Sequence, residues 1–327
     1  LKKCFTMKVN LSKSVFVLIA LFLFISTSCS SDNDEMNGES KKVNCAISFA
    51  YVENFIGSGR YPDFAKSCSL WVFDESGKLV KSFSESGEKV ASLDYTVNLS
   101  LPEGRYDFVA WFGIEEQSLV KLGANPPGSV EDLALSLQLD PVVGGVSETF
   151  SRDLPVIYNG HLTDVEIKRT ASANVARNVR MNLIRDSKII DIRLVGRNND
   201  EIKNGDVNFK ITNGNNLITW DNSLKATTSF CYRPINEREY EINTDASGEY
   251  TTLIASFSTF PLSIGTDHRL IVTRLSDNTE VINISLVEAL LKEKPMQFPD
   301  GSDEEYIARK DFFTLIFALG EDEVNGK

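Results

Sequence analysis

The chain has 327 residues, 42% of them hydrophobic, and a formal net charge of −12 at pH 7. This length and composition predict a globular protein of about two domains, each large enough for its own core. Without residues 1–28, which hold four lysines and no acid, the formal charge is −16; such a surface repels phosphate backbones, which excludes nucleic acid as an expected partner.

The first apolar stretch, residues 15–25, follows basic residues and ends in small residues and Cys29. These 11 residues are too few to cross a bilayer, which takes about 20, but they suit the apolar region of a signal peptide. Although the leucine of the commonest lipobox is absent, the pattern predicts a bacterial lipoprotein signal peptide over residues 1–28, cut between Ser28 and Cys29, with lipid on Cys29. The alternative is an ordinary secretory signal whose cut lies near a cysteine.

Residues 30–44 contain almost no apolar side chains. They cannot bury enough surface to offset the entropy of ordering. We therefore expect residues 29–44 to form a flexible tether between the lipid and the folded protein.

Three further cysteines, Cys45, Cys68 and Cys231, follow the one predicted to carry lipid. Their spacing matches no metal site. An exported compartment permits disulfides, but if residues 45–52 and 67–73 form adjacent antiparallel strands, Cys45 and Cys68 lie at opposite ends of the pair. Buried free thiols are therefore expected rather than a bridge.

Beyond the tether, apolar and polar residues alternate with a period of two, which is typical of half-buried strands in antiparallel sheets. Tight turns separate the runs, as at residues 74–77 and 102–104, where a glycine can adopt a positive φ. Short strands joined by such turns predict an all-β protein built of sandwiches. The clearest runs cover residues 47–51, 95–101, 106–112, 207–211 and 313–319.

Helical signals are few. Ser129 caps a predicted short helix over residues 129–132, and residues 286–294 predict a second helix that Pro295 ends. A polar segment around residues 160–172 precedes new long strands. We place the domain boundary there, which gives an N-terminal domain at 45–165 and a C-terminal domain at 166–327.

The sequence offers little for catalysis. Its two histidines, His161 and His268, are both expected in loops, and no nucleophile, metal or phosphate-binding motif is present. The acidic residues 300–305 are expected to form a solvated loop rather than a cation site, and a hydrolase with a carboxylate pair is the least favoured class. No catalytic residue, metal or cofactor is predicted, apart from the lipid on Cys29.

Two ordered stretches resemble one known family. SLWVFDESGKLVKSF at residues 69–83 and YTVNLSLPEGRYDFVAWFG at 95–113 resemble the FimB and Mfa-type fimbrial anchor and minor subunits of Bacteroidetes, and residues 306–319 are similar to the closing strand of that family. Within these motifs turn chemistry and core volume indicate five structural residues: Trp71, Asp74, Gly77, Gly104 and Trp111.

The resemblance implies two tandem transthyretin-like β-sandwich domains in a non-enzymatic, surface-exposed subunit of a type V pilus, attached to the outer membrane by lipid. It also implies strand complementation, in which a strand of one pilus subunit fills a groove in the next. The retained lipid favours a basal anchor; a tip or accessory adhesin that binds a host or bacterial surface ligand is the alternative. A surface glycan-binding lipoprotein is a third class, which requires Trp220, Tyr232, Tyr240 and Tyr250 to gather on one surface.

The loop after the first predicted strand contains Arg60 beside a Gly-Ser-Gly sequence, a shape accessible to trypsin-like cleavage. The resemblance implies that shaft subunits of such pili are cut at an arginine, which releases the first strand. A cut after Arg60 would also remove the lipid tether. We therefore expect Arg60 to stay intact in an anchor.

Overall fold

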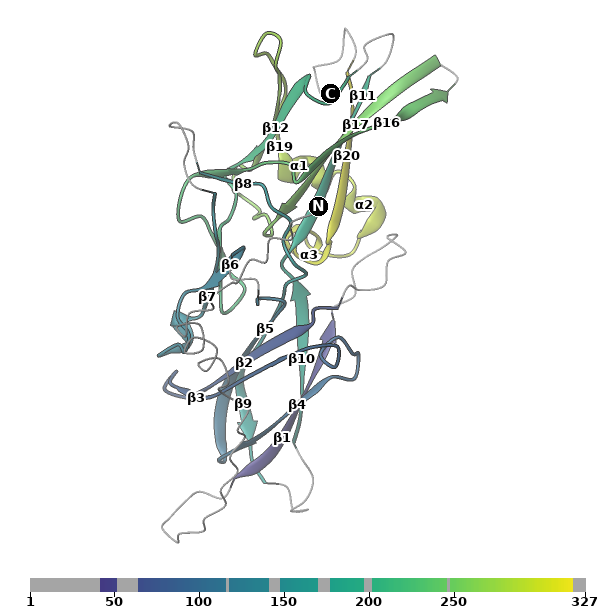
Figure 1. The fold of residues 1–327 in the computed structure, drawn as a ribbon. Coiled ribbons are helices and arrows are strands. Elements are labelled where there is room, and N and C mark those ends of the chain that lie inside the picture. Colours follow the sequence, from purple (N-terminus) through teal and green to yellow (C-terminus); the bar gives the residue numbers. More distant parts are fainter. Residues whose placement is uncertain are drawn as a thin grey trace, which may run out of the picture. The chain divides into compact units, whose positions relative to one another are not determined.

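A computed structural model of the protein describes residues 42–51, 64–115, 118–140, 148–169, 177–196, 202–245 and 248–319, with the backbone alone at 239–245, 248–249 and 319. All of these residues belong to one compact unit, Lys41–Lys327. Strands make up most of the described chain (Figure 1). The prediction of an all-β sandwich fold is confirmed; where the sequence predicts one or two short helices, the described chain contains three short α-helices and one short 3-10 helix.

The N-terminal part forms a seven-stranded sheet in the order β3-β2-β5-β9-β10-β1-β4. β10 runs parallel to β1, and its last two residues then pair with β9. One strand thereby joins the two halves of a sandwich. The bounds are β1 Val43–Tyr51, β2 Ser67–Asp74, β3 Leu79–Ser86, β4 Thr96–Leu101, β5 Gly104–Phe112, β9 Tyr158–Ile167 and β10 Arg177–Arg185.

The alternating residues of these strands meet in one core. Val97, Leu99 and Leu101 of β4 and Phe108 and Phe112 of β5 are buried in it. The face that the sequence predicted to point inward therefore does so. Polar neighbours such as those at positions 98 and 100 are exposed.

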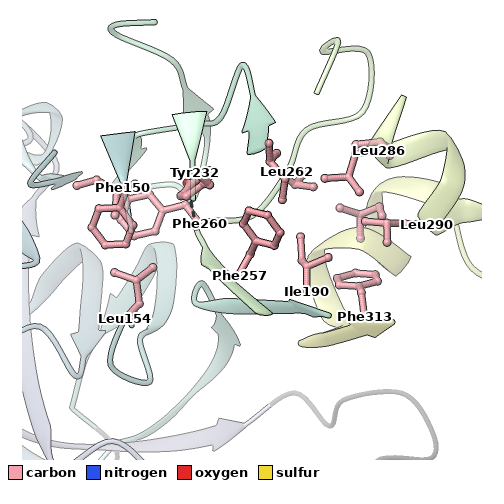
Figure 2. Close-up of a cluster of buried hydrophobic side chains, with 14 of the residues drawn as sticks. Phe150, Leu154, Ile190, Tyr232, Phe257, Phe260, Leu262, Leu286, Leu290 and Phe313 are labelled. Carbon is pink, nitrogen blue, oxygen red and sulfur yellow. Dashed lines mark hydrogen bonds between the residues drawn. The ribbon is translucent and has the colours of Figure 1, made fainter. Parts of the chain in front are cut away.

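The C-terminal part contains a four-stranded sheet, β16-β17-β11-β20, and a five-stranded sheet, β19-β18-β12-β15-β8. Side chains of both sheets and of helix α1 pack into a shared apolar cluster (Figure 2). The bounds are β8 Glu148–Phe150, β11 Lys188–Gly196, β12 Val207–Thr212, β15 Phe230–Tyr232, β16 Asn236–Asp245, β17 Gly248–Thr259, β18 Arg269–Arg274, β19 Glu280–Ser285, α1 Leu286–Leu291, α2 Lys294–Gln297, α3 Asp303–Arg309 and β20 Phe312–Leu319.

A small fourth sheet, β14-β13-β7-β6, combines strands from both halves of the sequence. Its buried side chains belong to the same cluster as Trp71 and Trp111, so the outer face of β2 and β5 is covered. Ser129 precedes a short 3-10 helix, as predicted. The bounds are β6 Val120–Leu122, the 3-10 helix Val130–Asp132, β7 Ala134–Leu137, β13 Leu217–Thr219 and β14 Leu224–Lys225.

Strands on one side of the predicted domain boundary at residue 165 pair with strands on the other side. The boundary itself stays a prediction. β8 precedes it and pairs with β15 in the C-terminal sheet, whereas β10 follows it and pairs with β1. β1 begins within residues 29–44, the range predicted to form the tether. Val43 and Asn44 already belong to β1 and pair with β4, because the Val43 side chain is buried.

The assumed pairing of the first two strands is wrong: β1 lies between β10 and β4, whereas β2 lies between β3 and β5. Cys45, Cys68 and Cys231 are buried free thiols. Burial raises the pKa of the Cys45 thiol to about 11 and that of Cys68 to about 12. These thiols are core residues with low reactivity.

Two helix predictions need correction. α1 ends at Leu291, and Pro295 lies in the first turn of α2 rather than ending a helix, a position where proline costs no hydrogen bond. The predicted acidic loop instead begins α3, because the Ser302 hydroxyl accepts the backbone N–H of Glu305 at 3.0 Å. The acidic side chains of this first turn also face the positive end of the helix dipole.

Candidate functional site

The two predicted core tryptophans lie on neighbouring strands, Trp71 on β2 and Trp111 on β5. Their exposed fractions are 3% and 0%, and their rings meet edge to face with centroids 6.1 Å apart. Neither ring can reach a sugar or another ligand at the surface. The pair supplies core volume between the N-terminal sandwich and the small sheet.

The turn after β2 has the predicted chemistry. Oδ1 of Asp74 accepts the backbone N–H groups of Ser76 and Lys78 at 2.9 and 3.2 Å, and the Ser76 hydroxyl with these amides lowers the pKa of Asp74. Gly77 has φ of +76°, a conformation that favours glycine. The motif therefore sets the register of the β2–β3 hairpin.

Gly104 does not have the predicted positive φ. It begins β5, where a Cβ atom would lie 3.4 Å from the Tyr106 hydroxyl oxygen. That hydroxyl donates to the Pro102 carbonyl at 3.0 Å. Glycine thus leaves room for the Tyr106 ring across the turn, rather than relieving backbone strain.

β1 fills the space between β4 and β10. Its backbone pairs antiparallel with β4 and parallel with β10. Its own inward-facing side chains, Val43, Cys45, Ile47 and Phe49, are buried. Because β1 is hydrogen-bonded on both sides, removing it would open a groove with unpaired backbone groups and apolar pockets. In this structure the chain's own first strand occupies that groove.

The aromatic platform required for the glycan-binding alternative is not assembled. Tyr232 is completely buried, and its hydroxyl donates to the Asn215 carbonyl at 2.8 Å. Trp220 lies elsewhere, donating to Glu131 at 3.2 Å and meeting the ring of His161 at 5.9 Å. Tyr250 is half-buried in β17, and the Tyr240 side chain is outside the described residues.

The histidines do not form a catalytic centre. His161 lies in β9 and not in the predicted loop, since the strand pairing with β5 extends through it. His268 lies in a loop, as predicted, but it is buried and accepts the Ser263 backbone N–H at 3.0 Å. Burial lowers the pKa of His268. Among the described residues, no group of three potential metal ligands occurs.

Three predicted functional residues, Ser28, Cys29 and Arg60, lie outside the described residues. Within the described ranges, no helix has the length and apolar character needed to cross a bilayer. Sequence reasoning missed that β1 lies beside β10. The two strands are far apart in the sequence: the Ser48 hydroxyl of β1 donates to the carbonyl of Val179 in β10, which lies 131 residues later. The alternation in both strands was the available signal, but it does not specify a partner.

The fold matches solved structures of bacterial proteins. A candidate adhesin from Bacteroides thetaiotaomicron VPI-5482 has a TM-score of 0.71 and 22% identity, covering 86% of this chain and 92% of that one. The fimbrial anchor protein Mfa2 from Porphyromonas gingivalis has a TM-score of 0.58 and 15% identity, with coverage of 85% and 90%. At these identities the matches establish the fold alone. No curated protein sequence matches significantly.

The family assignment comes from the sequence. The model of the fimbrillin-A associated anchor proteins Mfa1 and Mfa2 matches residues 30–327, which include both stretches that carried the resemblance. The match extends over nearly all of the chain and confirms the family predicted from those motifs. The protein is therefore a member of the fimbrillin-A associated anchor family, a family of fimbrial subunits of the cell surface.

Proposed function

We propose that this protein is the basal anchor of a type V pilus, held in the outer membrane by lipid on Cys29 and joined to the next subunit by strand complementation. The observation that carries the proposal is β1, which fills its groove between β4 and β10 from within the same chain. A subunit whose groove is already filled needs no donor strand at that position. It can end a fibre while its N-terminal tether reaches the membrane.

The position of Arg60 adds to this argument. It follows β1 in the sequence, so a cut there would separate both β1 and Cys29 from the rest of the protein. The cut would expose the apolar side chains that β1 covers and would release the fibre. An anchor therefore requires the bond after Arg60 to stay intact.

Replacing Cys29 by alanine is expected to abolish incorporation of a labelled fatty acid and to move the protein from the membrane fraction to the soluble fraction. Two or three acyl chains hold a protein far more firmly than one chain can, so pili should also be shed into the medium. Ser31→Ala in the same tether is the matched control and should stay in the membrane fraction. Pili that remain firmly attached in the Cys29→Ala strain would contradict the anchoring role.

Immunogold labelling separates the basal anchor from the tip or accessory adhesin. We expect label where pili meet the cell, and N-terminal sequencing of purified pili should show no chain that begins at Tyr61. Arg60→Ala should leave pilus number and attachment unchanged. Label confined to distal ends, or a mature chain that starts at Tyr61, would rule out the anchor.

A further inference from the structure

A cavity of about 410 Å³ lies in the C-terminal part of the protein. Its walls come from the end of β10, the β13–β14 turn, the segment after β17 and helix α3, and they include Ile184, Asn222, Leu262 and Ile307. Its volume is within the range of ligand pockets, about 300–1,000 Å³, and is many times the roughly 30 Å³ that one water occupies. The cavity can therefore hold a small organic molecule.

Asp186 lines this cavity at the junction of β10 and β11. The residue is 0% exposed, and neither carboxylate oxygen accepts a well-formed hydrogen bond among the described residues; the one side-chain donor beside it is the neutral amide of Asn222. Its backbone is fixed, because its N–H donates to the Ile157 carbonyl at 2.8 Å. A buried carboxylate with only one neutral amide beside it costs free energy unless a ligand or a proton also satisfies it.

The cations beside Asp186 have another counter-ion. Nζ of Lys188 donates to the Ala308 carbonyl at 2.6 Å and to Oδ1 of Asp311 at 3.3 Å, and the guanidinium of Arg185 lies 3.8 Å from Oδ2 of Asp311. Burial raises the pKa of Asp186 to about 7, although the positive charge of Lys188 and the Asn222 side chain oppose the shift. The Lys188 charge is thus insufficient to stabilise both carboxylates.

The remaining charged wall residue is acidic. Glu304 of α3 lines the cavity and is exposed, so the mouth presents a second carboxylate. A ligand that satisfies Asp186 must donate hydrogen bonds, and a positive charge on the donor would be attracted by both acids. Apolar walls such as those of Ile184 and Leu262 then accommodate a hydrocarbon body.

We propose that this cavity is a binding site for a primary organic ammonium ion, with the ammonium group on Asp186 and the hydrocarbon body against Ile184, Leu262 and Ile307. The inference does not depend on lipidation of Cys29 or on the position of the subunit in the fibre. It rests on one buried carboxylate, the volume beside it and the charge of the rim.

Titration calorimetry of the full chain with n-hexylammonium chloride tests the proposal, with sodium hexanoate as the probe of opposite charge. Measurements at about 0.15 M salt screen attraction to the acidic surface at large. We expect saturable binding of hexylammonium, none of hexanoate, and about tenfold tighter binding at pH 8 than at pH 6, because Asp186 must lose its proton. The charged groups that face Asp186 or line the cavity are Arg185, Lys188, Asp311 and Glu304.

Variants locate the site. Asp186→Asn keeps the shape and should weaken hexylammonium binding at least tenfold, and Ser223→Trp, on the exposed wall, should weaken it by filling the space. Asp191→Asn is the matched control, since Asp191 is buried in β11 away from the cavity and accepts the Ser256 hydroxyl at 2.7 Å; its binding should equal that of the unmodified protein. Absence of binding, equal binding by the Asp186→Asn variant, or preference for hexanoate would overturn the proposal.

Discussion

Replacing Gly113 by alanine is expected to lower the free energy of unfolding by roughly 2 to 5 kcal/mol, the sum of a backbone and a packing cost. Gly113 follows β5 and has φ of +76°, so any Cβ there pays about 1–2 kcal/mol. The Cβ would also lie 1.9 Å from the Val156 carbonyl oxygen. That oxygen is backbone and cannot rotate away, so the two backbone segments must move apart.

A Gly77→Ala variant measures the backbone cost without the packing cost. Gly77 has the same φ of +76°, but nothing lies within 4 Å of a Cβ placed on it. Gly77→Ala should therefore cost only the backbone part, about 1–2 kcal/mol. Urea unfolding of both variants, followed by tryptophan fluorescence from the buried Trp71 and Trp111, gives the comparison. Equal losses in the two variants would show that the Val156 contact does not constrain the fold.

Local sequence patterns predicted the parts of the fold whose causes are local. The β2–β3 turn follows from the short side chain of Asp74 and the glycine at position 77, and the inward face of β4 follows from its alternation. A helix-capping pattern is also present at Ser302 and Glu305, within the acidic segment 300–305 for which the sequence analysis predicts a loop. In that case the signal existed and the density of acidic residues concealed it.

Long-range pairing could not be predicted in the same way. β1 joins β10 in a parallel pair, and parallel neighbours have no connecting turn to mark them. The parallel pairing of β8 with β15 is equally non-local, and with only three residues β8 is too short to show a clear alternation. Strand alternation specifies which face is buried, but not which strand lies alongside.

The cavity could not be predicted from the sequence for a related reason. Asp186 and Lys188 adjoin a strongly apolar strand in the sequence, so their burial was foreseeable. The arrangement that leaves Asp186 without a cation of its own depends on Asp311, which is distant in the sequence and pairs with the Lys188 ammonium. Such competition between two carboxylates for one cation appears only when all three are placed in space.

Asp186→Asn is expected to stabilise the protein at pH 8 and to change its stability little at pH 4. In the unfolded chain an aspartate has a pKa of about 3.9, whereas burial raises the pKa of Asp186 to about 7 in the folded protein. Between these values the folded protein binds more protons than the unfolded chain. The Asp186 contribution to stability is therefore complete below the unfolded pKa and is lost as the pH rises to about 7.

The size of this loss follows from the shift. Each pKa unit corresponds to about 1.4 kcal/mol, so the advantage of the asparagine variant should grow by about 4 kcal/mol between pH 4 and pH 8. Lys188 keeps Asp311 as its counter-ion in the variant, so its charge remains paired. Urea unfolding of both proteins at several pH values gives the difference curve, in which groups common to both cancel.

Asp277→Asn provides a control of opposite sign. The Thr279 backbone amide lowers the pKa of Asp277, so its contribution is present above the unfolded pKa and is lost as the pH falls. Its difference curve should change at acidic pH and be level between pH 5 and pH 8, where that of Asp186→Asn rises. A level curve for Asp186→Asn over the same interval would mean that the Asp186 carboxylate is satisfied within the folded chain, leaving the cavity without its charged group.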